Sequence, residues 1–387
     1  MGKPIRYLVN DRCLFAGRSG IPIYLEELWR HWPRNSDVEL TGCCGALRKW
    51  CRLPSRRASQ ASWTWGIPLK ELLTRVCPDK PAGYRTVLHD LYRSWFKLQL
   101  RYGAYDGYFE PNNLAFDIDI PIVTTLHDLS VIEHPEWHPP ERVARWEKQF
   151  NHTLRATSHW IVPSHFTKQR LIAVAGVPED RISAIPLAPR NMSVNGGMGA
   201  LPDALRGCFL HLGTIEPRKN ILMLLSAYGR LPAELRERHR LVLVGAPGWG
   251  SDDFWTQLRE HPMSGEAIAI AGASDDQVAT ILSGAMVLLC ASHYEGFGLP
   301  VVEAMAAGVP VVRTSIPVME EVAGSASLTV SGEDASEWSR IMVEICEDAT
   351  LRQSLSERGR ARALATYAWS STAEQHMRAL GAAARRR

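Results

Sequence analysis

The 387-residue sequence lacks several features that would assign a chain to a familiar class. Its eight cysteines form no CxxC pair and no zinc-type spacing, which favours a reducing compartment. No apolar run approaches the ~20 residues that span a bilayer, and the N-terminus lacks the apolar core and cleavage site of a secretory signal. These absences predict a cytoplasmic protein.

Common catalytic motifs are missing as well. The chain has no GK[ST] phosphate loop, no HExxH and no GxSxG, so nothing argues for a P-loop enzyme, a zinc protease or a hydrolase of that type. Asp117–Asp119 has the DxD form used by some metal-dependent transferases, but it precedes its predicted strand, so we interpret it as turn chemistry. His127, His134, His138 and His152 are too loosely spaced to predict zinc. We expect no metal and no cofactor.

The charge is small overall but unevenly placed. The formal net charge is +3, which calls for no nucleic-acid partner. Thr41–Arg101, however, carries 12 Lys+Arg against 3 Asp+Glu, so the rest of the chain is net acidic. Within it, Leu47–Arg101 interleaves tryptophans with basic residues, which suits an anionic membrane surface and a lipid-linked acceptor. The alternatives are a solvated basic face and a weaker case for nucleic-acid binding.

Short β-type runs alternate with amphipathic helical patterns, which is typical of parallel α/β layers. The alternation lapses at the Gly/Pro-rich stretch Leu187–Gly207, which we interpret as a linker. The predicted fold class is therefore α/β, with two Rossmann-like doubly wound domains facing a cleft, over residues 1–190 and 205–365. The expected strands are Ile5–Asn10, Tyr105–Glu110, Pro121–Asp128, His159–Ser164, Cys208–Gly213, Arg240–Gly245, Ala267–Gly272, Met286–Ala291 and Gly308–Arg313.

In such sheets ligands bind outside the carboxyl ends of the strands, so the loops there are the places to search. The loop SHYEGFG follows one strand and leads into a predicted helix, Leu299–Ala307, with Pro300 in its first turn. The free N–H groups and the positive dipole end of that helix suit a phosphate. Gly296 and Gly298 let the main chain approach a ligand closely.

Two acids accompany this loop. Glu295 lies on it and Glu303 lies near the start of the helix, so both carboxylates are expected to reach one cleft. Carboxylates accept hydrogen bonds from sugar hydroxyls, whereas N–H groups suit phosphate. The combination predicts a ligand with a sugar and a phosphate. The alternative is a solvated loop ahead of a core helix.

A basic pair marks a second loop, HLGTIEPRKN (His211–Asn220). The strand is expected to end at Gly213, and Arg218 and Lys219 are expected to open the next helix. Cations are unfavourable at a helix start, so they need another reason. A bound diphosphate supplies one, because two cations and helix N–H groups neutralise it without a metal. An exposed basic pair is the alternative.

Two loops of the first half are weaker signals. Gly17–Tyr24 is a flexible loop entering a helix, and a simple turn explains it equally well. Thr125–Ser130 places His127 and Asp128 just past a strand end, where they either face a ligand or form a structural hydrogen-bonded pair.

Together these motifs resemble a known family. EGFGLPVVEAMAAGVPVV (Glu295–Val312) is similar to the glutamate–seven–glutamate signature of retaining glycosyltransferases of family GT4, which have the GT-B fold. HLGTIEPRKN and TLHDL also resemble that family, especially bacterial mannosyltransferase-like members from surface-polysaccharide clusters. The resemblance covers nearly the whole chain and ends at a helix near Trp369. We expect this helix, about residues 366–387, to pack back on the first domain.

The resemblance implies a role for each matched position. Glu295 would contact the donor sugar, Glu303 the ribose hydroxyls and Lys219 the diphosphate. His127 would lie near the transferred sugar, and Gly20 near the diphosphate. The expected catalytic residues are His127, Arg218, Lys219 and Glu295. The expected donor-binding residues are Gly20, Asp128, Gly213, Thr214, Gly296, Phe297, Gly298, Leu299 and Glu303.

The chain departs from the family pattern at two places. Many members have an arginine where this chain has Thr214, and Arg218 is expected to take its place. The GIGRY string common in this subgroup is GIPIY here, so Pro22 and Ile23 replace two residues on the expected acceptor side.

The reaction implied is transfer of a hexose, by our choice mannose from GDP-mannose, to a hydroxyl of a lipid-linked or oligosaccharide acceptor, with retention of configuration. Arg218, Lys219 and helix N-termini would stabilise the departing phosphate, and that phosphate would assist deprotonation of the acceptor. Three alternatives stay open: a nucleotide-sugar epimerase of the same fold, a non-catalytic nucleotide-sugar-binding subunit, and a glycoside phosphorylase, for which we find no pyridoxal-phosphate lysine context.

Overall fold

The computed structural model describes residues 3–15, 20–34, 36–43, 67–68, 82–190 and 201–385. Residues 16–19 of the first glycine loop and 191–200 of the predicted linker lie outside the described residues. So does most of the basic segment Leu47–Arg101, including Trp50, Trp63 and Trp65.

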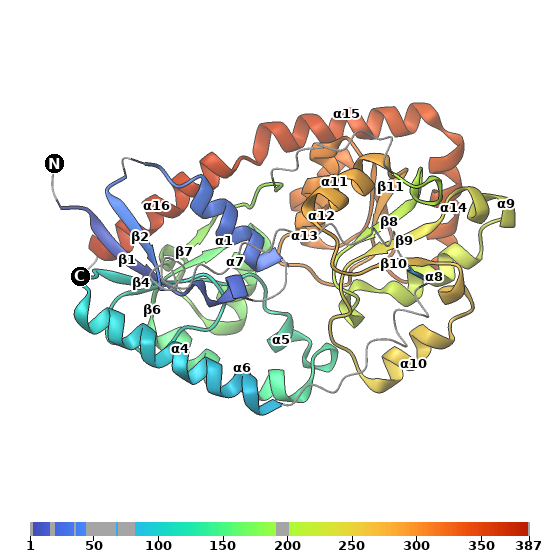
Figure 1. The fold of residues 1–387 in the computed structure, drawn as a ribbon. Coiled ribbons are helices and arrows are strands. Elements are labelled where there is room, and N and C mark those ends of the chain that lie inside the picture. The colour runs from blue at the N-terminus through green and yellow to red at the C-terminus, as the bar shows by residue number, and fades with distance from the viewer. Residues whose placement is uncertain are drawn as a thin grey trace.

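The chain forms two lobes, each built on a parallel sheet with helices on its faces (Figure 1). In the described part of the first lobe the sheet has six parallel strands in the order β2-β1-β4-β5-β6-β7. Their bounds are β1 Ile5–Val9, β2 Val38–Gly42, β4 Gly107–Glu110, β5 Ile122–Thr125, β6 Thr157–Val162 and β7 Ile182–Ala184. The helices of this lobe are α1 Gly20–Arg30, α4 Ala82–Tyr102, α5 Ser130–Glu133, α6 Pro140–Ala156 and α7 His165–Ala175.

The second lobe holds a seven-stranded sheet in the order β13-β12-β11-β8-β9-β10-β3. Its own strands are β8 Phe209–Leu212, β9 Leu241–Val244, β10 Ile268–Ile270, β11 Val287–Cys290, β12 Val311–Thr314 and β13 Leu328–Val330. Its helices are α8 Ile221–Gly229, α9 Ala233–Arg238, α10 Asp252–Glu260, α11 Asp275–Gly284, α12 Leu299–Ala307, α13 Pro317–Val322, α14 Ala335–Glu347 and α15 Ala349–Thr366.

The strands form where the sequence is apolar without interruption. All four residues of β9 and all four of β11 are buried, as expected for parallel strands covered on both faces. Parallel pairing places the carboxyl ends of β8, β9 and β11 at one edge of the second sheet. The loops that the sequence singled out therefore emerge side by side.

Two segments cross between the lobes. The short strand β3, Ile67–Pro68, comes from the first half of the chain but pairs antiparallel with β10 of the second sheet. At the other end α15 packs along α12, and α16 (Trp369–Arg385) returns to the first lobe, where it packs against α1, β2 and β6 (Figure 1). The hydroxyl of Tyr7 in β1 donates to the carbonyl of Leu380 at 2.9 Å. The C-terminal helix is thus part of the first lobe.

None of the described helices combines the length and the apolar character that a membrane span requires.

Candidate active site

The EGFG loop and its helix have the bounds that the sequence predicts. α12 begins at Leu299 and ends at Ala307, between two glycines in the left-handed region, Gly298 with φ 95° and Gly308 with φ 74°. A Cβ at Gly298 would lie 2.7 Å from the Cε of Met319 in α13, the flexible end of a side chain that can move, so it is the backbone angle that requires glycine. The N-terminus of α12 is therefore held at the carboxyl edge of the sheet.

The loop also touches the first lobe. A Cβ at Gly296 would lie 1.8 Å from the carbonyl oxygen of His127, so the two strand-end loops meet backbone to backbone. The carbonyl oxygen of Gly296 accepts hydrogen bonds from the hydroxyls of Ser164 at 2.7 Å and Thr167 at 3.0 Å. These contacts bring His127 and the Glu295 loop to one place at the lobe boundary.

Glu295 joins the two predicted cations. Its Oε1 forms an ion pair with Nζ of Lys219, and its Oε2 accepts from Nη1 of Arg218 at 3.0 Å. The hydroxyl of Ser292 donates to Oε1 at 2.8 Å. Nε of Arg218 lies 2.6 Å from Oε1 of Glu216, a fully buried carboxylate. The basic pair thus faces carboxylates on two sides.

These contacts fix the protonation states. Burial alone would raise the pKa of Glu295, but Lys219 and Arg218 lower it to about 2. Burial opposes the charge of Arg218, yet Glu295, Glu216 and Asp128 together raise its pKa. Glu295 is therefore a carboxylate that can accept sugar hydroxyls, and Arg218 is a permanent cation.

His127 is neutral and held by the main chain. Its Nε2 lies 2.9 Å from the carbonyl oxygen of Pro111, which only accepts, so Nε2 carries the hydrogen and Nδ1 has a free lone pair. Burial lowers the pKa of the ring, which keeps it neutral at physiological pH. Its backbone N–H donates to Oδ1 of Asn113 at 2.8 Å. Nδ1 is thus suited to accept a hydrogen bond from a sugar hydroxyl.

Tyr24 and His376 support His127 from behind. The rings of Tyr24 and His127 meet edge to face, with centroids 5.1 Å apart. The hydroxyl of Tyr24 contacts Oγ1 of Thr125 at 2.9 Å and Nε2 of His376 at 2.8 Å. Burial lowers the pKa of His376 to about 4. The C-terminal helix α16 therefore helps to position His127 through Tyr24, and no local sequence motif predicts this role.

Glu303 is engaged elsewhere. It is fully buried, and Arg190 holds it in a bidentate pair, with Nε to Oε1 at 2.6 Å and Nη2 to Oε2 at 3.0 Å. Nη1 of Arg190 also donates to Oδ1 of Asp275 at 3.1 Å, at the start of α11. A ribose at Glu303 would have to share this carboxylate with Arg190, and its binding there stays a prediction.

Comparison with known proteins decides the family. The model for group 1 glycosyl transferases matches residues 206–362, and that for glycosyltransferase family 4 matches residues 83–188. O-antigen chain mannosyltransferase B of Escherichia coli is 32% identical over 302 residues, which are 76% of this chain and 78% of that protein. The chain belongs to glycosyltransferase family 4.

Two further comparisons agree with the fold of this glycosyltransferase. A D-inositol 3-phosphate glycosyltransferase of Stackebrandtia nassauensis is 32% identical over 328 residues, covering 80% of this chain and 70% of the relative. The crystal structure of Anabaena Alr3699/HepE in complex with UDP-glucose superposes with a TM-score of 0.65 at 17% identity, covering 98% of this chain and all of that one. The predicted GT-B architecture is thereby confirmed.

The basic pair of the glycosyltransferase does not open a helix as predicted. Arg218 and Lys219 lie in a 3-10 turn, Pro217–Lys219, and α8 starts only at Ile221. Asn220, which lies between this turn and α8, has φ 56°, a left-handed conformation that asparagine tolerates better than most residues. The cations therefore precede the helix, and carboxylates rather than a helix end are their neighbours.

The remaining predicted residues have mixed surroundings. Asp128 accepts the N–H and hydroxyl of Ser130, at 3.0 and 2.7 Å, and so also helps to start α5. Phe297 turns its ring into the core against Tyr367, with centroids 5.7 Å apart, which leaves only its backbone for a ligand. The others lie at strand ends or helix starts and are at least partly accessible: Gly20, Gly213, Thr214 and Leu299.

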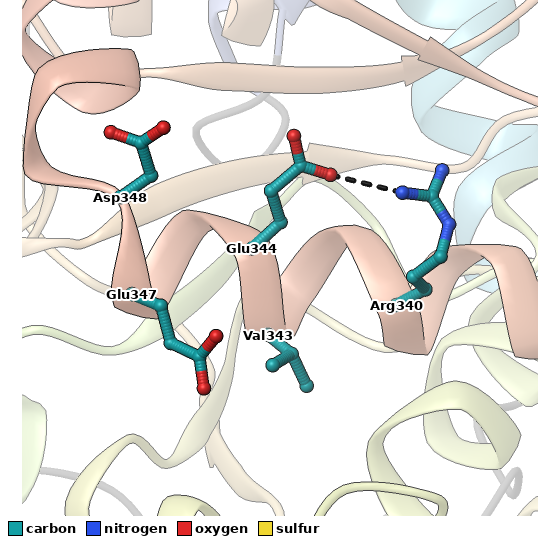
Figure 2. Close-up of a pocket in the computed structure, with 5 residues that line it drawn as sticks. All are labelled: Arg340, Val343, Glu344, Glu347 and Asp348. Carbon is teal, nitrogen blue, oxygen red and sulfur yellow. Dashed lines mark hydrogen bonds and ion pairs between the residues drawn. The ribbon is translucent and has the colours of Figure 1, made fainter.

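Metal-binding clusters and surface hollows were also sought in the described part of the enzyme. Among the described residues, no group of three or more histidines, cysteines or acids is placed to hold a metal ion. A hollow of about 420 Å³ lies along α14 and is lined by Arg340, Val343, Glu344, Glu347 and Asp348. Figure 2 shows Arg340 paired with Glu344 there, while Glu347 and Asp348 point to different sides. This surface is remote in the fold from the loops that hold Glu295 and His127.

Proposed function

We propose that this protein is a retaining hexosyltransferase that moves mannose from GDP-mannose to a hydroxyl of a lipid-linked or oligosaccharide acceptor in cell-surface polysaccharide synthesis. The observation that carries the proposal is the buried Lys219–Glu295–Arg218 cluster beside the N-terminus of α12 and the carbonyl of His127. It combines cations for a diphosphate with a carboxylate for a sugar. The name of the Escherichia coli relative supports the choice of mannose.

The residues suggest how the transfer would be promoted. As the glycosidic bond breaks, charge develops on the leaving β-phosphate, and Arg218, Lys219 and the N–H groups of α12 would stabilise it. One preorganised donor of this kind contributes about 3 kcal/mol in comparable enzymes. Nδ1 of His127 would accept a hydroxyl of the transferred sugar, and Glu295 would hold another. The leaving phosphate would take the proton of the acceptor hydroxyl, with no metal required.

Purified protein tests the proposal when it is mixed with GDP-mannose, UDP-glucose and other nucleotide sugars, with and without a polyprenyl-diphosphate-linked glycan. A retaining transferase yields an α-mannosylated product from GDP-mannose only when acceptor is present. An epimerase instead yields a changed nucleotide sugar without acceptor, and a binding subunit yields a thermal shift with GDP but no product. Inversion of the anomeric centre, seen by NMR, would contradict retention.

We also propose that the enzyme is cytoplasmic and attaches to the inner face of the membrane through α4. Four large apolar residues of this helix lie on its outer side at spacings of 4, 3 and 4: Leu91, Trp95, Leu98 and Tyr102, exposed by 63, 38, 46 and 77%. The opposite side holds the fully buried Phe96. α4 runs along the outer edge of the first lobe (Figure 1). Scattered exposed apolar residues are ordinary, but a stripe on one helix favours a partner surface.

The charges beside the apolar stripe of α4 indicate which kind of surface it binds. Lys97 and Arg101 are exposed on the flank of this stripe, and both fall in the basic segment read from the sequence. A helix with an apolar stripe and a basic flank lies in the interface of an anionic bilayer, where each cation contributes about 1 kcal/mol. An anionic lipid surface is therefore the expected occupant, and it would bring the enzyme to a lipid-linked acceptor.

Flotation with vesicles tests this attachment. The wild type is expected to float with phosphatidylglycerol-containing vesicles and to detach as salt rises. K97Q/R101Q should bind about 30-fold more weakly, since it loses about 2 kcal/mol, and L91S/L98S should also be weakened. L364S is the matched control, because Leu364 is exposed on α15 but stands alone. Equal flotation of all variants, or a dimer that disappears in L91S/L98S without any lipid binding, would rule the proposal out.

A further inference from the structure

A second group of charged and aromatic side chains lies at the boundary between the lobes. His138, Arg142 and Arg145 come from the first lobe, at and just before the start of α6, and Trp249 comes from the loop after β9. The guanidinium carbon of Arg142 lies 4.0 Å from the centre of the Trp249 ring, and the His138 ring centre lies 5.4 Å from it. We call these four residues the boundary cluster. Side chains of the two lobes are thus in direct contact here.

Several polar atoms of the boundary cluster are unsatisfied. Nδ1 of His138, Nε of Arg142 and Nε1 of Trp249 are buried, and none has a hydrogen-bond partner among the residues that the structure describes. A buried donor without a partner costs about 1–3 kcal/mol. Arginine and indole nitrogens can only donate, so the missing partner is an acceptor. Two such donors together indicate a ligand with acceptor oxygens. His138 differs, because its Nε2 donates to Oγ of Ser130 at 3.1 Å, which leaves Nδ1 as an acceptor for a hydroxyl.

The cluster also concentrates positive charge. Nε of Arg142 has no hydrogen-bond partner among the described residues, and Arg145, which is exposed, lies one turn further along α6. Burial lowers the pKa of Arg142, and the nearby positive charges of Arg145 and Arg218 lower it further. The carboxylates of Asp128 and Glu216 act in the opposite direction and raise it. Burial and then the charge of Arg12 lower the pKa of Arg145. Arginines gathered in this way favour an anion between them.

The position of the cluster separates it from the donor phosphates. Arg218, Lys219 and the α12 N-terminus all belong to the second lobe, in the loops after β8 and β11. Arg142 and Arg145 approach from the opposite lobe, although Arg142 is close enough to Arg218 and Asp128 to feel their charges. The cluster is therefore adjacent to the reaction centre but faces the reactant that enters from the first lobe.

We propose that the boundary cluster binds an anionic group of the acceptor, a phosphate or a carboxylate on the sugar next to the hydroxyl that receives the hexose. This inference rests on the proposed function. Stacking on Trp249 fixes the plane of the Arg142 guanidinium and leaves its N–H groups free to bind two oxygens side by side. Nε1 of Trp249 would donate to the same group, Nδ1 of His138 would accept a hydroxyl of the sugar beside it, and Arg145 would add charge.

Isothermal titration of GDP-saturated full-length protein tests the inference with three probes: methyl α-D-mannopyranoside, its 6-phosphate, and methyl α-D-glucuronopyranoside. We expect at least one anionic probe to bind about 10-fold or more tightly than the neutral mannoside. Whichever anionic probe binds more tightly shows whether the cluster prefers a phosphate or a carboxylate. R142Q and R142K should both lose that preference, because lysine cannot bind side by side. The affinity for GDP should stay unchanged.

R155Q is the matched control, since Arg155 is an exposed arginine at the far end of the same helix. Equal affinity for neutral and anionic probes in the wild type would overturn the inference. So would a loss of GDP affinity in R142Q that equals its loss of probe affinity, because the cluster would then serve the donor. If GDP itself fails to bind the wild type, the proposed function fails first, and the two failures are thereby told apart.

Discussion

At the scale of single residues, the site depends on charges held inside the protein. Lys219, Arg218 and Glu295 are all largely buried, and breaking such a pair on one side leaves an uncompensated charge that costs about 3–5 kcal/mol. Local sequence predicted these three residues because their spacing within each loop is typical of the family. It could not predict that Arg190 would pair with Glu303, because that contact joins segments 113 residues apart in the chain.

Glu110 gives a pH prediction at the same scale. It ends β4, is 1% exposed, and accepts from Nδ2 of Asn10 at 2.5 Å and from the N–H of Asn112 at 2.9 Å. Burial raises its pKa from 4.5 to about 7 despite these bonds. The folded protein then binds this proton more tightly than the unfolded chain, so the contribution is complete below pH about 4.5 and is lost as pH rises through about 7.

Urea unfolding at pH 5 and pH 8 measures this effect. The wild type should lose up to about 3 kcal/mol of unfolding free energy through this one group between the two pH values. E110Q cannot titrate and should show a flatter dependence, whereas E234Q, an exposed glutamate on α9, should follow the wild type. An unchanged slope in E110Q would show that Glu110 is already ionised in the folded protein.

At the scale of elements, the sequence predicted most of the strands and both bounds of α12. Uninterrupted apolar runs such as that of β9 permit little else, and Gly298 and Gly308 stop α12 at both ends. The start of α8 was predicted too early because the left-handed Asn220 is visible only in the backbone. The strand β3 was not foreseen either, since its partner β10 is about 200 residues away.

The EGFG loop gives the second prediction. G296A adds a methyl group 1.8 Å from the carbonyl oxygen of His127, so the loop must move away from the first lobe. A displacement of about 1 Å at a reacting centre costs about 100-fold in rate, and we expect a loss in kcat/KM of that order. G265A is the control, because nothing lies within 4 Å of the added methyl group there. Transfer assays giving equal rates for both variants would show that contact between the loops is not needed.

At the scale of the whole molecule, a few contacts hold the lobes together. Glu321 on α13 accepts the backbone N–H groups of His165 at 2.7 Å and Phe166 at 2.9 Å, at the start of α7 in the other lobe. Hydrogen bonds to a charged group contribute about 1.5–3 kcal/mol, and here they also meet the positive end of a helix. The terminal helix α16 adds a permanent connection. The way the two lobes meet therefore depends in part on the hydrogen bonds of Glu321.

E321A should shift the ligand-free protein toward an open arrangement. Small-angle X-ray scattering is expected to show a larger radius of gyration than in the wild type, and GDP should reduce the difference if the donor draws the lobes together. E347A, which removes an exposed glutamate from α14, should scatter like the wild type. Identical profiles for E321A and the wild type would mean that other contacts hold the lobes.

The central claim is that protein cations beside Glu295 neutralise the diphosphate of an activated sugar. The most direct test is the rate of GDP-mannose-dependent transfer by K219Q, compared with K148Q, an exposed lysine on α6. We expect kcat/KM to fall about 100-fold or more in K219Q, equivalent to about 3 kcal/mol of transition-state stabilisation, and to be unchanged in K148Q. A correctly folded K219Q that transfers within threefold of the wild-type rate would contradict the account.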